Sequence, residues 1–263
     1  MPNSIFTDQI NRKIELNDVP KRIVCLVPSL TELLFDLGAE DEVVGITFFC
    51  VHPKEKVGDV AKIGGTKTVK IDKVRELKPD LVIASKEENI KEQIEAIEEF
   101  CPVWVSDVVD LTSALEMIKM LGQVLNKNDQ AANIIEQIAG GFKAIAPIDA
   151  SAIYLIWRKP WMCAGNDTFI HDVIQKAGLN NVIVDPRYPQ LSNEEIRSLN
   201  PEFILLSSEP YPFKQKHIEE VAKIASKSKV VLVDGEMFSW YGSRLHKTPD
   251  YINRLNLQLK TSE

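Results

Sequence analysis

Hydrophobic residues recur with two different periods along this chain, and the two patterns alternate. Short runs rich in Val, Ile and Leu are followed by stretches in which apolar residues return every three or four positions. The first pattern is typical of buried strands and the second of amphipathic helices. Strands that alternate with helices and are apolar almost throughout predict parallel sheets covered on both faces. The predicted fold class is therefore α/β.

The whole pattern occurs twice, which predicts two similar lobes. Each half contains a helix end, a proline, an acidic residue and a buried strand, as LKPDLVIAS in one and LNPEFILLS in the other. The two prolines, Pro79 and Pro201, are 122 residues apart (201 − 79 = 122). The other predicted strands also correspond in pairs: 22–27 with 152–157, 43–47 with 182–185, and 103–107 with 230–234.

One long predicted helix separates the two repeats. From Asn128 to Ala146 apolar residues, among them Ala132 and Ile138, return at helical spacing, and Pro147 ends the run. At about 1.5 Å per residue this helix would be roughly 28 Å long. The predicted architecture is thus two Rossmann-like lobes with parallel sheets, residues 1–126 and 148–263, bridged by a helix at 127–147.

Composition and charge exclude several classes of protein. The chain is 44% hydrophobic and 26% charged, which is typical of a globular protein. Its net charge of −7 argues against a nucleic-acid partner, which would need a basic face. The N-terminal sequence lacks the apolar core of a signal peptide, and no run approaches the roughly 18 apolar residues of a membrane span. Taken alone, the chain is expected to be cytoplasmic, or an exported protein recorded without its signal.

Candidate binding residues of the first lobe follow its predicted strands. Ser29 and Glu32 match a capping box, and the helix start would lie at the sheet edge where ligands of α/β proteins bind. After the second strand, the sequence FFCVHP places Phe49 beside a thiol and an imidazole. Cys50 and His52 are residue types that ligate soft or borderline metals, although two ligands do not complete a site. Packing, or support beside a ligand, is the alternative for both.

Aromatic residues gather in the loops that follow the predicted strands of the second lobe. A single aromatic residue beside a strand usually belongs to the core, but four such loops at one edge predict a cleft for a large, partly planar ligand. Arg187 and Arg244 would meet carboxylates or phosphates on that ligand. The residues of this half that are expected to contact it are Trp157, Arg187, Tyr188, Trp240 and Tyr241.

Enzyme motifs are missing from the sequence. It contains neither phosphate-binding glycine motif, GxxxxGK[ST] or GxGxxG, and no GxSxG elbow. No nucleophile has a matching base, and His171, His217 and His246 fit surface or capping positions. The chain is therefore expected not to be an enzyme and to have no cofactor of its own. A cytoplasmic chelatase or corrinoid-processing enzyme on the same scaffold is the alternative of another class.

Several stretches together resemble the helical-backbone substrate-binding proteins of ABC importers. They are RIVCLVPSLTELLFDLG, VVGIT, LKPDLVIAS and AGNDTFIHDVIQKAGLNNV, with the bridging helix between the third and the fourth. The resemblance spans about Val19 to Arg254 and is closest to the cobalamin receptors. It implies a periplasmic receptor that holds a corrinoid between its lobes at the strand ends and closes only slightly. Haem or a ferric siderophore is the alternative ligand, so the cargo would be cobalamin or an iron complex.

The same resemblance implies that the partner is the permease of an ABC importer. Members of this family carry on each lobe an acidic residue that docks to arginines of the permease. The offset of 122 residues pairs Glu87 with Glu209, which are the expected docking residues, and Glu88 and Glu92 are nearby alternatives. The chain would be a monomer that reaches the membrane only through its permease.

Overall fold

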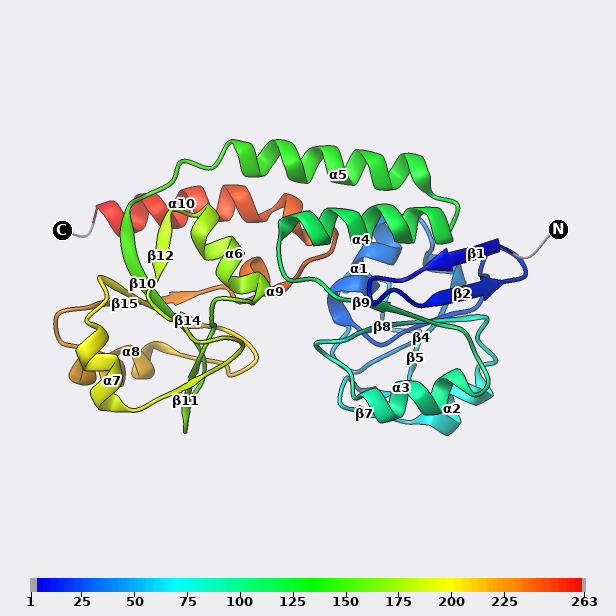
Figure 1. The fold of residues 1–263 in the computed structure, drawn as a ribbon, viewed down its shortest axis with the longest axis horizontal. Coiled ribbons are helices and arrows are strands. Elements are labelled where there is room, and N and C mark those ends of the chain that lie inside the picture. The colour runs from blue at the N-terminus through cyan, green and yellow to red at the C-terminus, as the bar shows by residue number, and fades with distance from the viewer. Residues whose placement is uncertain (1–3, 262–263) are drawn as a thin grey trace. The chain divides into compact units, whose positions relative to one another are not determined.

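The computed structural model describes residues 4–261, and their contacts divide the chain into two compact units (Figure 1). The first unit comprises the chain up to residue 108, residues 112–138 and residues 241–244. The second comprises residues 109–111, 139–240 and the chain from 245 onward. Each unit is an α/β structure built on its own sheet. The predicted boundaries assigned residues 241–244 to the C-terminal lobe, whereas their contacts belong to the first unit.

The first unit contains a five-stranded sheet in which every neighbouring pair is parallel. Every residue of the inner strands β3 and β8 and of the edge strand β9 is buried, because helices cover both faces of the sheet. The parallel sheet predicted for this half is confirmed. Its strands, in spatial order, are β5 (Ala61–Lys62), β4 (Val43–Ile46), β3 (Ile23–Cys25), β8 (Leu81–Ser85) and β9 (Val103–Ser106).

Helices and two small hairpins complete the first unit. Helices α2 and α3 lie on one side of the sheet and α4 lies on the other (Figure 1). The helices are α1 (Pro28–Asp36), η1 (Glu40–Glu42), α2 (Ile71–Glu76), α3 (Lys91–Glu98) and α4 (Leu111–Val124). The antiparallel hairpins are β1 (Ser4–Thr7) with β2 (Lys13–Leu16), and β6 (Gly64–Gly65) with β7 (Thr68–Val69).

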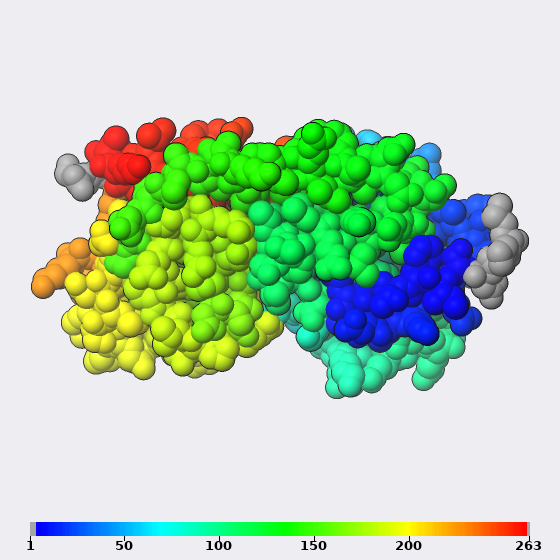
Figure 2. All heavy atoms as spheres, turned by 45° about the horizontal axis from the view of Figure 1, so that its top comes forward, coloured from blue at the N-terminus to red at the C-terminus, as the bar shows by residue number. Residues whose placement is uncertain are grey.

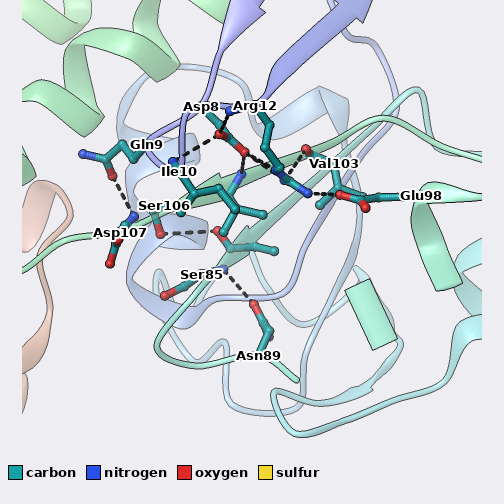
Figure 3. A network of polar contacts seen from close by, with 12 residues as sticks. Asp8, Gln9, Ile10, Arg12, Ser85, Asn89, Glu98, Val103, Ser106 and Asp107 are labelled. Carbon is teal, nitrogen blue, oxygen red and sulfur yellow. Dashed lines mark hydrogen bonds and ion pairs between the residues drawn. The ribbon is translucent and has the colours of Figure 1, made fainter. Parts of the chain in front are cut away.

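The loop between β1 and β2 covers the outer edge of strand β9 (Figure 3). The Gln9 N–H donates to the Val105 carbonyl at 3.2 Å, and the Val105 N–H donates to the Asp8 carboxylate at 3.3 Å. One step along the chain, the Asp107 N–H donates to the Gln9 side-chain oxygen at 3.0 Å. An uncovered strand edge can pair with another chain, so this hairpin, blue in Figure 2, protects the sheet. The sequence did not reveal it.

Replacing Asp8 with alanine should lower the free energy of unfolding by about 2 kcal/mol, because buried donors would lose their acceptor. The Asp8 carboxylate accepts from the Ile10 N–H at 3.1 Å, and from the Arg12 N–H at 2.8 Å and guanidinium at 2.9 Å. Urea denaturation followed by fluorescence of Trp104, in β9, measures the effect. Glu15→Ala, an exposed acid on the same hairpin, is the control and should cost less than about 0.5 kcal/mol. Equal losses in both variants would contradict this role.

Helix α5 (Asn128–Lys143) carries the chain from the first unit into the second. The predicted bridging helix is confirmed in place, but it ends before Ala146. The Ala144 N–H bonds to the Gly141 carbonyl, so the last turn tightens and the helix stops. The predicted apolar face was also partly wrong, because Ala132 is exposed whereas its neighbour Ala131 is buried.

The second unit contains a mixed six-stranded sheet. Strand β10 pairs in parallel with β12 and β14, and β14 pairs in parallel with β15. Strands β11 and β13 add antiparallel pairs, because the connection from β10 to β11 is only residues 158–160, too short for a parallel crossover. The parallel pairing predicted for this half is confirmed for β10, β12, β14 and β15, and the antiparallel β11 and β13 were not predicted. The strands are β10 (Ala150–Trp157), β11 (Trp161–Cys163), β12 (Leu179–Asn181), β13 (Gln190–Leu191), β14 (Phe203–Ser207) and β15 (Lys229–Val233).

One predicted strand of this unit lies three residues too late. Residues 182–185 form no strand, and β12 ends at Asn181. The Asn181 side-chain amide donates to the Ala164 carbonyl at 3.0 Å, and its oxygen accepts from the Ile183 N–H at 3.2 Å. These side-chain hydrogen bonds take the place of further backbone pairing between strands, so the chain leaves the sheet after Asn181.

Helices separate most of the strands of the second unit, as the alternating pattern predicted. Thr168 caps helix α6 by accepting from the His171 N–H. Among residues 4–261, no helix has both the length and the apolar character needed to cross a membrane. The helices are α6 (Phe169–Lys176), α7 (Asn193–Leu199), α8 (Gln215–Ile224), α9 (Glu236–Ser239) and α10 (Thr248–Lys260), and η2 (Ser243–His246) spans the boundary of the two units.

Candidate ligand-binding site

Two adjacent phenylalanines stand exposed at the carboxyl edge of the first unit's sheet. Phe48 is 55% exposed and Phe49 is 60% exposed in the loop that follows β4. The Phe48 N–H donates to the Gly64 carbonyl at 2.9 Å, which holds this loop against the β6–β7 hairpin. A Cβ on Gly65 would lie 3.2 Å from the Phe49 ring, so the glycine lets that ring sit close to the backbone. The loop therefore offers an aromatic contact surface, with Phe49 where the sequence predicted it.

The neighbouring Cys50 turns into the interior. Its side chain is 2% exposed, and its sulfur accepts from the Thr31 hydroxyl at 3.1 Å and lies 3.2 Å from the Thr47 hydroxyl. Burial raises the pKa of the Cys50 thiol, which disfavours the thiolate that binds metals. His52 is half-buried, and no group of three His, Cys, Asp or Glu side chains within residues 4–261 is placed to hold a metal. The structure thus gives Cys50 a packing role, and it brings no third ligand to the predicted metal pair.

The predicted capping box at Ser29 is wrong. Helix α1 begins two residues earlier than predicted, because Pro28 occupies its first position and Val27, not Ser29, is the N-cap. Ser29 lies inside the first turn at 3% exposure, and its hydroxyl has no hydrogen-bond partner among the residues described. The Glu32 carboxylate pairs with Arg244 instead of returning to the helix start. A ligand contact for Ser29 stays a prediction.

Tyr241 lies in the interior of the first unit rather than on an open aromatic surface. It is 5% exposed, and its hydroxyl forms hydrogen bonds with the Ser85 hydroxyl at 3.0 Å and the Glu88 carboxylate at 3.2 Å. Burial raises its pKa well above the ordinary value, so the phenol keeps its proton. The next residue, Gly242, passes so close to α1 that a Cβ would lie 2.4 Å from the Ser29 carbonyl oxygen.

The expectation that Arg244 meets the ligand is also corrected. Its guanidinium binds the Glu32 carboxylate through two hydrogen bonds of 2.7 Å, and both side chains are 8% exposed. The Ser243 hydroxyl donates a hydrogen bond to the carboxylate of Asp36, which lies on helix α1, as Glu32 does. Polar contacts therefore hold residues 241–244 against the first unit, and the ion pair of Arg244 with Glu32 is one of these contacts.

The second unit presents a cluster of aromatic rings where β10 and β14 end. Trp157, the last residue of β10, is 40% exposed and meets the Tyr211 ring edge-on at a centroid distance of 5.6 Å. The Tyr211 N–H donates to the Ile156 carbonyl at 3.3 Å, which fixes the loop after β14 beside β10. Tyr211 also meets Phe213 at 4.8 Å and the His217 ring at 5.5 Å. Trp157 was predicted, whereas Tyr211 and His217 were not assigned to a site.

Arg158 borders this cluster and is held in place by an acid. Its guanidinium forms hydrogen bonds of 2.8–3.1 Å with the Glu220 carboxylate on α8. That pairing, and to a lesser degree the nearby Tyr211, raises the pKa of Arg158. The sequence signal that could have revealed the group is the short spacing in YPFKQKH, which puts two aromatics and a histidine at the start of one helix.

A second loop of this unit carries Arg187 and Tyr188. Arg187 is exposed and has a positive φ of 60°, and its guanidinium lies 5.6 Å from the Tyr188 ring centroid. The Gly165 N–H donates to the Arg187 carbonyl at 2.7 Å, and the Asp167 carboxylate accepts from the Arg187 N–H. These contacts fix an uncommon backbone conformation, which presents both predicted side chains on one loop.

Trp240 and Glu209 bind each other inside the second unit. Trp240 is 7% exposed, and its indole N–H donates to the Glu209 carboxylate at 2.9 Å, as the Ser239 hydroxyl does at 2.7 Å. Burial raises the pKa of Glu209 despite these bonds. Glu87 is half-buried, and its carbonyl accepts from Lys67 at 2.9 Å. A ring contact for Trp240 and permease docking for Glu87 and Glu209 stay predictions, and Glu209 has an internal role in addition.

Residues 23–226 match the periplasmic binding protein family, and the chain belongs to that family. It is a family of transport binding proteins, not of enzymes, so the expectation that this chain is not an enzyme is confirmed. The resemblance seen in the sequence is confirmed as well. The fold and the family together define the class of this protein: it is a substrate-binding protein of ABC transport.

Similar proteins support this assignment. The chain is 28% identical to an ABC transporter substrate-binding lipoprotein of Bacillus subtilis over 75% of its own length and 67% of the relative's. It is 24% identical to a vitamin B12-binding protein of Vibrio parahaemolyticus, covering 73% of this chain and 72% of that one. Its fold matches a periplasmic haem-binding protein from Roseiflexus with a TM-score of 0.78, at 20% identity over 91% and 97% of the two chains. The predicted two-lobed α/β fold is therefore confirmed.

Proposed function

We propose that this chain is the substrate-binding receptor of an ABC importer and that it captures a corrinoid. Its family supports the receptor role, and the relative from Vibrio parahaemolyticus, a vitamin B12-binding protein, supports the ligand class. In this proposal the protein works outside the cytoplasmic membrane and passes its ligand to a permease. Co-purification with that permease tests the partnership.

One observation carries the ligand proposal: large aromatic side chains are exposed where parallel strands end. Phe48 and Phe49 are more than half exposed in the first unit, and Trp157 is 40% exposed in the second. Exposed aromatics cost free energy in water unless a ligand covers them, since burial of apolar surface yields about 25 cal/mol per Å². A corrin ring is broad and has apolar faces, so it suits such residues.

Haem or a ferric siderophore is the second candidate, and the loop of Arg187 favours it. The exposed Arg187, whose guanidinium lies over the Tyr188 ring, suits the propionates of haem or the anionic oxygens of a siderophore. The amide side chains of a corrinoid would use the same loop less strongly, because they are neutral.

A titration with cyanocobalamin, haemin and a ferric catecholate complex tests the proposal. We expect one of them to quench tryptophan fluorescence saturably at one equivalent. Trp157→Ala should weaken that ligand about tenfold, which corresponds to about 1.4 kcal/mol, because an aromatic contact is lost. Trp161→Phe is the matched control, since Trp161 is 8% exposed and packs on Phe213 inside the unit. If none of the three ligands binds, the proposed ligand class is wrong.

A further inference from the structure

His217 is buried beneath Tyr211 and has a defined tautomer. It is 4% exposed, and the Lys214 N–H donates to its Nδ1 at 2.8 Å. A ring nitrogen that accepts a hydrogen bond carries no proton, so the neutral imidazole holds its proton on Nε2. Nε2 lies 3.4 Å from the Tyr211 phenolic oxygen. The histidine therefore donates to Tyr211, through a long hydrogen bond.

A cation lies in the neighbourhood of Tyr211. The Arg158 guanidinium is held by Glu220 on α8, and the nearby Tyr211 contributes to its raised pKa. A phenol has two acceptor lone pairs and one donor hydrogen. Because the His217 Nε2–H donates to this oxygen, it uses a lone pair and not the hydroxyl hydrogen. The hydroxyl hydrogen is therefore available as a donor, on a ring that packs edge-on against the exposed Trp157.

We propose that Tyr211 donates a hydrogen bond to an acceptor oxygen on the rim of the ligand, and that neutral His217 positions it for this. The inference rests on the proposed function, because it assumes a ligand at the ends of β10 and β14. It specifies the ligand's chemistry as a planar group that covers Trp157 and has a carbonyl, amide or carboxylate oxygen at its edge. Tyr211 is the contact residue, and His217 is a positioning residue.

This arrangement makes binding sensitive to pH. The groups that face His217 are Tyr211 on its loop, Arg158 at the end of β10, and Lys214, Lys216 and Glu220 on or beside α8. Burial and then the three cations lower the pKa of His217, and only Glu220 opposes them. The ring is therefore neutral at pH 7.5. When the pH falls well below the ordinary histidine value of about 6.5, both nitrogens become donors and Nδ1 no longer accepts from Lys214. The loop that carries Tyr211 then loses its anchor.

Two variants and a spectroscopic measurement test the inference, with the probe that binds best in the titration. Tyr211→Phe keeps the ring and removes the hydroxyl, so it should weaken binding about tenfold at pH 7.5. For the wild type, Kd at pH 5.0 should exceed Kd at pH 7.5 by about tenfold. His217→Gln keeps an acceptor and a donor but does not titrate, so this ratio should fall to near one. His246→Gln, at an exposed histidine, should keep the wild-type ratio.

Nitrogen-15 NMR of the His217 ring at pH 7.5 reads the tautomer without any ligand. A proton on Nε2 supports the positioning role, and a proton on Nδ1 overturns it. If a probe binds the wild type and Tyr211→Phe equally well, the inference fails and the receptor function stands. If no probe binds, the proposed ligand class fails and the contact role of Tyr211 fails with it. Circular dichroism of each variant at both pH values separates these outcomes from a loss of fold.

Discussion

Replacing Glu32 with alanine should lower the free energy of unfolding of the first unit by about 3–5 kcal/mol. The substitution would leave the Arg244 guanidinium buried without the carboxylate that now binds it through two hydrogen bonds of 2.7 Å. Both side chains are 8% exposed, so water screens the pair poorly. Loss of this ion pair would also loosen residues 241–244, which it anchors to helix α1.

Urea denaturation followed by Trp104 fluorescence measures this effect, since Trp104 is fully buried in the first unit. The control is Glu95→Ala, which breaks an exposed ion pair with Lys91 on helix α3 and should cost less than about 1 kcal/mol. The double variant Glu32→Leu with Arg244→Met should cost less than Glu32→Ala, because no unpaired charge stays buried. If the double variant is less stable than Glu32→Ala, the buried unpaired charge of Arg244 is not what destabilises Glu32→Ala.

Gly165→Ala should weaken ligand binding at least tenfold, about 1.4 kcal/mol, by displacing the loop that carries Arg187. A Cβ at this position would lie 2.2 Å from the Asp185 carbonyl oxygen and 2.8 Å from that of Arg187. These are backbone atoms, so the collision cannot be relieved by a side-chain rotation. The loop must move, and the hydrogen bond from the Gly165 N–H to Arg187 must lengthen.

The binding titration measures this loss, and Gly140→Ala is its control. Gly140 lies in helix α5 with open space around the added Cβ, so its replacement should stabilise the protein by about 0.5–1 kcal/mol and leave Kd unchanged. Arg187→Lys keeps the charge but not the planar guanidinium, and it should weaken binding if that group meets the ligand. Unchanged affinity in Gly165→Ala would show that the position of this loop does not govern binding.

Part of the candidate site could be predicted because exposed aromatics beside strands leave a visible sequence pattern. Phe49 and Trp157 are exposed at strand ends as expected, and Arg187 and Tyr188 share one loop. Trp240 and Tyr241 have the same pattern in the sequence, yet both rings are buried. Their burial depends on Glu209, Ser85 and Glu88, and no local pattern identifies such partners.

His217 illustrates the same limit. The sequence places it on an amphipathic helix, where surface and capping roles are common. Its actual position combines a backbone donor three residues earlier with Tyr211 above it and Arg158 beside it. Two of these partners are nearby in sequence, but the third, Arg158, directly follows strand β10. The predicted capping role is confirmed, because His217 accepts from the backbone N–H of the N-cap Lys214, whereas its burial was not predicted.

The sequence by itself determined the alternation of strands and helices, the repetition of that pattern and the long helix between the repeats. Hydrophobic periodicity is local, so each segment reveals its own period without its partners. Only the tertiary structure decided that the hairpin covers β9, that β11 and β13 run antiparallel, and that residues 241–244 belong to the first unit. The last of these rests on Arg244 and Glu32, which are 212 residues apart in sequence. A charge pair of that separation forms only when the fold has already brought its two segments together.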